Sequence, residues 1–126
     1  MPASFRTPLG RVRALGAARL GTQDAWRVHV TALALIPLSI AFVVIVLTLI
    51  HKDYNAARAV MSEPLPAVLM LLFVLTGLYH TELGMRSVIV DYIHGAMREW
   101  ALIANSCAAV GLGLACVYAV LRVGFV

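Results

Sequence analysis

The chain has 126 residues, of which 62% are hydrophobic and 13% are charged, and its mean hydropathy is +0.92. A soluble domain has roughly 45–50% apolar and about 25% charged residues. Because a small domain leaves much of its surface exposed, a water-soluble fold of this length has no means of hiding so much apolar surface. The composition therefore excludes a soluble enzyme, a disordered chain and a disulfide scaffold, and the length allows one domain at most.

Basic residues outnumber acidic ones by ten to six, which gives a formal net charge of +4. They do not alternate with aromatic residues and accompany no nucleic-acid-binding motif, so we expect no nucleic-acid partner. Residues 1–28 are rich in arginine and lack the apolar core and cleavage pattern of a secretory signal. We expect them to form a basic cytoplasmic segment that touches anionic membrane lipid or a partner protein. A transit peptide, which is also rich in arginine and poor in acids, is the alternative.

Three runs lack Asp, Glu, Lys and Arg: residues 30–50, 64–81 and 100–121. A membrane helix needs roughly 20 apolar residues, and the second run reaches that length only if its helix continues past Glu82 and Arg86. We therefore predict an all-α integral membrane protein whose residues 29–126 form three transmembrane helices within a heteromeric bundle. The predicted spans are about residues 30–50, 66–93 and 100–122.

The connections carry signals that end and start helices. Residues 51–55 form a polar stop after the first span. Pro64 suits the first turn of the next helix, and Ser62 or Glu63 is expected to cap it or to favour its positive end. Gly95 is expected to end the second span in the left-handed conformation.

Lysine and arginine counts predict the orientation. The N-terminal segment carries five arginines, which places the N-terminus in the cytoplasm and the C-terminus on the opposite side. The predicted location is a bacterial inner membrane, mainly because the N-terminal tail shows no clear processing site, with the mitochondrial inner membrane as the alternative.

Polar residues gather on one face of the second span. At about 100° per residue, His80, Gly84, Ser87 and Asp91 fall within about 60° of one another, and His94 is expected to continue the same face. Polar groups within a span are expensive, so this face is a candidate functional site.

Glu82 and Arg86 lie four residues apart near the opposite side, and the hypothesis for them is an ion pair of purely structural effect.

His80 is the most informative of these residues because it lies well inside the span. A histidine at this depth serves as a hydrogen-bonding contact between helices, as a proton relay or as a metal ligand. Gly84, one turn away, leaves room for a flat ring, as a haem with an axial histidine requires. This chain offers a single deep histidine, so a second ligand would come from another protein chain.

Asp91 and Tyr92 lie near the cytoplasmic end of the second span. A phenol beside a carboxylate is able to donate a hydrogen bond to a quinone carbonyl and to assist its protonation. The alternative for Tyr92 is an aromatic residue of the membrane interface. For His29 and His51, which bracket the first span, the expected role is likewise that of interfacial polar residues.

The sequence of residues 80–94 is His-Thr-Glu-Leu-Gly-Met-Arg-Ser-Val-Ile-Val-Asp-Tyr-Ile-His. It closely resembles the second-helix signature H-x-x-x-G-M-x-x-V-I/L-x-D-Y of the small hydrophobic membrane anchor of succinate dehydrogenase (respiratory complex II). The spacing matches without a gap. The start of the first span, with Trp26 and residues 31–38, is also similar to bacterial members of that family.

The resemblance implies a non-catalytic anchor within an enzyme complex. In this family His80 matches an axial ligand of haem b, which is shared with a second, larger membrane anchor. Tyr92 matches the tyrosine that hydrogen-bonds ubiquinone, and Asp91 matches a neighbouring acid beside the iron–sulfur subunit. The flavoprotein subunit is the remaining partner implied.

The chain departs from the family near the start of the first span, where the family usually has an arginine close to the haem propionates. Here Val28 and His29 occupy that place, with Arg27 just before them. Either Arg27 or His29 is the candidate for contact with the propionates.

Two hypotheses from other classes stay open. A small transporter or ion-channel subunit would use His80, Glu82, Arg86 and Asp91 as a proton or ion path. A purely structural scaffold needs no site, and it leaves the intramembrane histidine unexplained.

Overall fold

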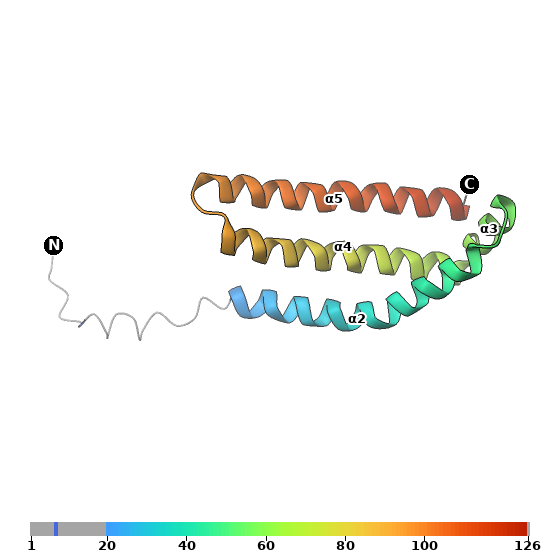
Figure 1. The fold of residues 1–126 in the computed structure, drawn as a ribbon, viewed down its shortest axis with the longest axis horizontal. Coiled ribbons are helices and arrows are strands. Elements are labelled where there is room, and N and C mark those ends of the chain that lie inside the picture. Colours follow the sequence, from blue (N-terminus) through green and yellow to red (C-terminus); the bar gives the residue numbers. More distant parts are fainter. Residues whose placement is uncertain (1–6, 8–19, 126) are drawn as a thin grey trace.

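The computed structural model describes residue 7 and residues 20–125, and the described part is all-helical. Its helices are α2 (Leu20–Leu49), α3 (Tyr54–Met61), α4 (Pro64–Tyr92) and α5 (Ala96–Phe125). The three long helices lie side by side with α4 in the middle, and short α3 lies at the end where α2 turns back into α4 (Figure 1). The four arginines at positions 6, 11, 13 and 19 lie outside the described residues.

Three helices are long and apolar enough to cross a membrane: Thr22–Leu49, Pro64–Tyr92 and Ala96–Gly124. They contain 28, 29 and 29 residues, and at about 1.5 Å per residue each is longer than the roughly 30 Å of bilayer hydrocarbon. The structure confirms the predicted all-α class with three candidate spans.

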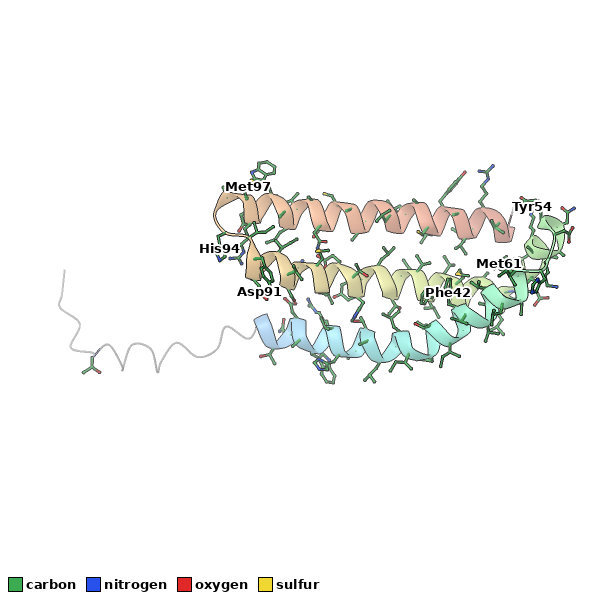
Figure 2. All side chains as sticks on the ribbon, in the orientation of Figure 1. Phe42, Tyr54, Met61, Asp91, His94 and Met97 are labelled. Atoms are coloured by element: carbon green, nitrogen blue, oxygen red, sulfur yellow. The ribbon has the colours of Figure 1, made fainter. Side chains whose placement is uncertain are left out.

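The interior of the described chain is small. Five hydrophobic residues are buried: Ile45, Met61, Ala67, Leu83 and Ile89. Large apolar side chains elsewhere are exposed, among them those of Leu33, Ile40 and Val110. Figure 2 shows side chains projecting outward along the long helices. Such a surface is stable only where lipid or other protein chains cover it.

The first helix begins at Leu20, well before the charge-free run that starts at Val30. The added turns carry Asp24 and Arg27, whose side chains form an ion pair at 3.4 Å. A charge-free run marks the part of a helix that lies inside the hydrocarbon. The polar end of the helix continues into the interface, so the run underestimates the length of the helix. The helix passes through Pro37 and curves in its C-terminal half (Figure 1).

Helix α3 was not expected from the sequence. The Ser62 hydroxyl donates to the carbonyl oxygen of Arg58 at 2.8 Å, so Ser62 ends α3 and does not cap α4. Glu63 holds the N-cap position of α4 but makes no side-chain hydrogen bond there, and Pro64 follows as the first helical residue. The backbone of α3 comes close to α5, because a Cβ on Gly124 would lie 3.1 Å from the carbonyl oxygen of Met61.

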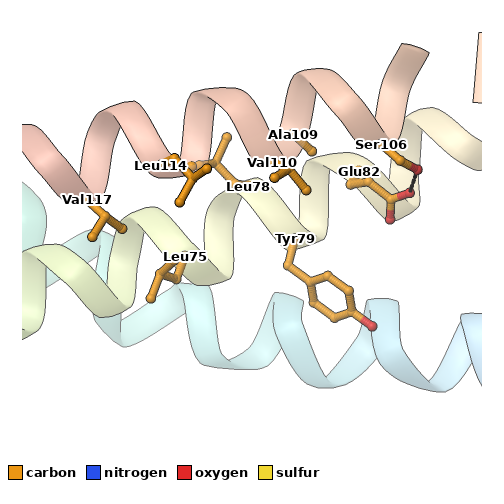
Figure 3. Close-up of a pocket in the computed structure, with 10 residues that line it drawn as sticks. Leu75, Leu78, Tyr79, Glu82, Ser106, Ala109, Val110, Leu114 and Val117 are labelled. Carbon is orange, nitrogen blue, oxygen red and sulfur yellow. Dashed lines mark hydrogen bonds between the residues drawn. The ribbon is translucent and has the colours of Figure 1, made fainter. Parts of the chain in front are cut away.

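The two sides of α4 differ in how they pack against the neighbouring helices. Toward α2, the rings of Phe42 and Phe73 stack with centroids 4.4 Å apart and planes 13° apart. Toward α5, the helices leave an apolar groove of about 370 Å³ (Figure 3). Its lining includes Leu75, Tyr79, Glu82, Ser106, Val110 and Gly113.

The turn between α4 and α5 confirms the expected role of Gly95. Ile93, the C-cap of α4, is extended, and Gly95 has a φ of 68°. Because α4 ends at Tyr92, His94 lies in the turn and not on the helix. The expectation that His94 continues the polar face of the helix is therefore wrong.

Replacing Gly95 by Ala is expected to destabilise the fold by about 1–2 kcal/mol, because a Cβ is disfavoured by that amount in the left-handed region. Reversible unfolding of the purified protein in mixed detergents measures the difference. Gly111→Ala is the matched control, since a Cβ on Gly111, inside α5, would meet no atom within 4 Å. Equal stability of the two variants would contradict the prediction.

Candidate functional site

His80 is held at the contact between α4 and α2. Its side chain is half-buried, and its Nδ1 atom lies 2.8 Å from Oγ1 of Thr31 on α2. Within residues 20–125, the other ring nitrogen, Nε2, has no hydrogen-bond partner. The ring is therefore anchored through one nitrogen and leaves the other free for a ligand.

Space is open on α4 one turn beyond His80. A Cβ built on Gly84 would meet no atom within 4 Å, and the residue is exposed in the described chain. The helix face next to the imidazole therefore has room for a flat ligand at Gly84.

A groove of about 460 Å³, the α2–α4 groove, lies between α2 and α4 toward the end where α2 begins. Its polar lining comes from Asp24, His29, Arg86, Ser87 and Asp91. Ser87 and Asp91 therefore face α2, as His80 does, which confirms the shared polar face predicted from helical spacing.

Tyr92 does not line this groove, although it follows Asp91 directly. It is the last residue of α4, its side chain is 79% exposed, and within the described residues its hydroxyl has no hydrogen-bond partner. Asp91 and Tyr92 thus share the end of the helix but point to different surroundings, as their separation of about 100° on the helix requires.

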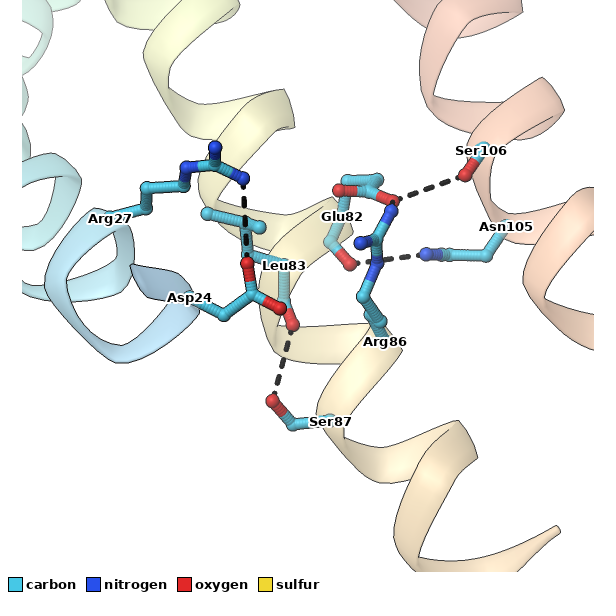
Figure 4. Close-up of polar contacts among 8 residues, drawn as sticks. All are labelled: Asp24, Arg27, Glu82, Leu83, Arg86, Ser87, Asn105 and Ser106. Atoms are coloured by element: carbon cyan, nitrogen blue, oxygen red, sulfur yellow. Dashed lines mark hydrogen bonds and ion pairs between the residues drawn. The ribbon is translucent and has the colours of Figure 1, made fainter. Parts of the chain in front are cut away.

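The two candidates for haem propionates differ in their contacts. Arg27 is paired with Asp24 at 3.4 Å (Figure 4). The Nδ1–H group of His29 donates to the carbonyl oxygen of Ala25 at 2.7 Å, and the ring lines the α2–α4 groove. His51 lies beyond the opposite end of α2 and is exposed.

Glu82 and Arg86 form the predicted ion pair at 3.1 Å, on the side of α4 that faces α5. The Ser106 hydroxyl donates to the same Glu82 carboxylate at 3.1 Å, and Asn105 donates to the Glu82 backbone carbonyl at 3.1 Å (Figure 4). The Glu82 side chain is only 11% exposed, so this network supplies the partners that a carboxylate within a span needs.

The transporter hypothesis requires one path through its four residues, and they face two different helices. His80 is hydrogen-bonded to α2, whereas Glu82 is hydrogen-bonded to α5. Asp91 lines the groove on the α2 side.

The uncharged polar partners of these groups were not predicted from the sequence. They are Thr31, Asn105 and Ser106. The available signal was a hydroxyl or amide group inside a charge-free run, because such groups in a span usually bond to another helix. The position of Arg86 beside the α2–α4 groove was also not predicted. Its side chain is paired with Glu82 and also lines this groove.

Residues 3–120 match the family model of the succinate dehydrogenase/fumarate reductase transmembrane subunit. The chain is 35% identical to the succinate dehydrogenase hydrophobic membrane anchor subunit of Paracoccus denitrificans over 120 residues, which are 95% of this chain and 93% of that protein. It is 30% identical to the protein of the same name from Rickettsia bellii (strain RML369-C) over 93 residues, 74% of each chain. No solved structure gives a significant match. The chain therefore belongs to the family of succinate dehydrogenase and fumarate reductase transmembrane subunits, as a hydrophobic membrane anchor.

Proposed function

We propose that this anchor holds haem b through His80 and forms part of a ubiquinone-reducing site with Tyr92 and Asp91. The observation that carries the proposal is the half-buried His80 ring, which is fixed through Nδ1 and has a free Nε2 inside a membrane span. An imidazole in that state is the neutral ligand that iron takes. The chain itself would not oxidise succinate, because that step belongs to soluble partners in the proposed complex.

The residues on this face of α4 fit the cofactor. His80 would supply one axial ligand, and the open space at Gly84 would admit the ring edge. The larger membrane anchor of the complex would supply the second ligand. When bound, the haem supplies one-electron redox chemistry. Of the two candidates for its propionates, His29 is favoured, because its ring lines the α2–α4 groove whereas the Arg27 side chain is paired with Asp24.

The end of α4 suits quinone reduction. This reaction takes up two protons with two electrons, so the site needs proton donors with access to water. Tyr92 presents an exposed phenol that is able to donate to a quinone carbonyl, and the exposed carboxylate of Asp91 is its neighbour in the chain. The iron–sulfur subunit of the complex would dock beside this end and deliver the electrons.

The residues of the proposed quinone site lie at one end of the bundle. The start of α2 and the turn between α4 and α5 lie at the same end (Figure 1). The arginine-rich residues 1–28 include the start of α2. Their charge favours a cytoplasmic location for this end of the bundle in a bacterial inner membrane. The iron–sulfur and flavoprotein subunits would bind there, while the exposed apolar helix surfaces would contact the larger membrane anchor and lipid.

Replacing His80 by Ala is expected to remove the low-spin haem signal from the purified complex, because the iron loses an axial ligand. The reduced-minus-oxidised optical spectrum measures this change. His51→Ala is the control, since His51 is exposed at the far end of α2 and should leave the spectrum unaltered. An unchanged spectrum for the His80 variant would refute ligation.

Replacing Tyr92 by Phe is expected to lower quinone reduction by about 10- to 100-fold, because the site loses a hydrogen-bond donor to the quinone. Succinate oxidation with an artificial acceptor should stay near the wild-type rate, because that electron path ends before the quinone. Tyr118→Phe, an exposed tyrosine of α5, serves as the control. Parallel loss of both activities in the Tyr92 variant would argue against a quinone role.

A further inference from the structure

We infer that Thr31 is a positioning residue, which fixes the proton of His80 on Nδ1 and so keeps the Nε2 lone pair turned to the ligand. The inference rests on the proposed ligation of haem iron by His80. The contact that carries it is the 2.8 Å distance between Thr31 Oγ1 and His80 Nδ1, which joins α2 to α4. Such a contact admits two proton arrangements, since a hydroxyl and an imidazole nitrogen both donate and accept.

The surroundings of the hydroxyl decide between the two arrangements. Thr31 Oγ1 lies 2.9 Å from the carbonyl oxygen of Arg27 and 3.1 Å from that of Val28. Carbonyl oxygens only accept, so the single hydroxyl proton has to lie between Oγ1 and these oxygens. If it pointed at His80 instead, three oxygens would meet at these distances without a proton between them, and their lone pairs would repel.

The imidazole must therefore donate to Thr31. With the hydroxyl proton committed to the carbonyls, Oγ1 presents a lone pair toward the ring, and the bond requires a hydrogen on Nδ1. In a neutral imidazole the other nitrogen, Nε2, then carries the lone pair that binds a metal. Without Thr31, both tautomers would be available to the ring, and only one of them presents a lone pair on Nε2.

The same bond also tunes the ligand. A histidine that donates its second N–H to an acceptor is a more basic ligand, and such partners typically change metal affinity by about 10- to 100-fold. A more basic imidazole favours ferric over ferrous iron. The Thr31 contact therefore acts on two measurable quantities, the haem content of the complex and its midpoint potential.

The test compares three variants of Thr31 in the whole purified complex. Thr31→Val keeps the shape of the side chain and removes the hydroxyl, whereas Thr31→Ser keeps the hydroxyl and removes the methyl group. We expect Thr31→Val to lower the affinity for ferric relative to ferrous haem by about tenfold. This change corresponds to a rise of about 59 mV in the midpoint potential of a one-electron couple. The g values of the ferric haem should shift with it, and Thr31→Ser should behave as wild type. Should the valine complex not assemble, Thr31→Ala removes the hydroxyl without bulk and gives the same measurement.

A second threonine of α2 provides the matched control. The Thr48 hydroxyl donates to the carbonyl oxygen of Ile45 at 2.6 Å and has no histidine partner within the described residues, so Thr48→Val removes a similar hydroxyl without touching His80. This variant should leave the potential and the g values unchanged.

The outcomes separate the inference from the proposal beneath it. If His80→Ala removes the haem signal but Thr31→Val leaves potential and g values as in wild type, the role of Thr31 is overturned and ligation stands. Equal shifts in Thr31→Val and Thr31→Ser would also overturn it, because they would trace the effect to side-chain packing and not to the hydroxyl group. If His80→Ala keeps the signal, the ligation itself fails.

Discussion

The pairing of polar groups on the central helix is the constraint on which this structure depends. A polar or charged group inside a bilayer has no water to bond with, so each must find a partner within the protein. On helix α4 two such groups find partners on different sides: His80 bonds through Nδ1 to Thr31 of α2, and Glu82 bonds to Arg86 and to Ser106 of α5. These bonds also fix how α4 is rotated between its neighbours, because a rotated helix would leave the imidazole and the carboxylate without partners.

Apolar packing alone would not specify that rotation. The described chain buries only five hydrophobic residues, and its long helices expose large aliphatic side chains all round. Lipid tails are as apolar as leucine, so burying these side chains between helices gains little over leaving them in the bilayer. The stacked rings of Phe42 and Phe73 add shape complementarity on the α2 side. As a membrane anchor, the chain reaches its full set of contacts only within its complex.

Charge and hydropathy were enough to predict the spans, because the cost of a charge in hydrocarbon dominates every other local preference. They were not enough to predict where α2 begins, since Asp24 and Arg27 cost a helix little at the interface, where water still reaches them. Short α3 also escaped prediction, because its eight residues carry no long apolar run and the helix packs against the ends of α4 and α5. The face shared by His80, Ser87 and Asp91 followed from helical periodicity, whereas the partner of His80 depended on the tertiary contact with Thr31.

The proposed haem and quinone functions are connected by the geometry of one helix. His80 and Tyr92 lie on the same uninterrupted α4, twelve residues apart, which is about 18 Å of helical rise. Each residue is in the environment that its proposed role needs: the imidazole is half-buried and tethered to α2, while the phenol is exposed where α4 ends. A ligand for a metal must be held in one orientation, whereas a donor to an exchanging quinone must be accessible. A continuous helix satisfies both needs, because its rigid backbone keeps the two groups at a constant separation while its position in the bilayer sets how much water each one meets.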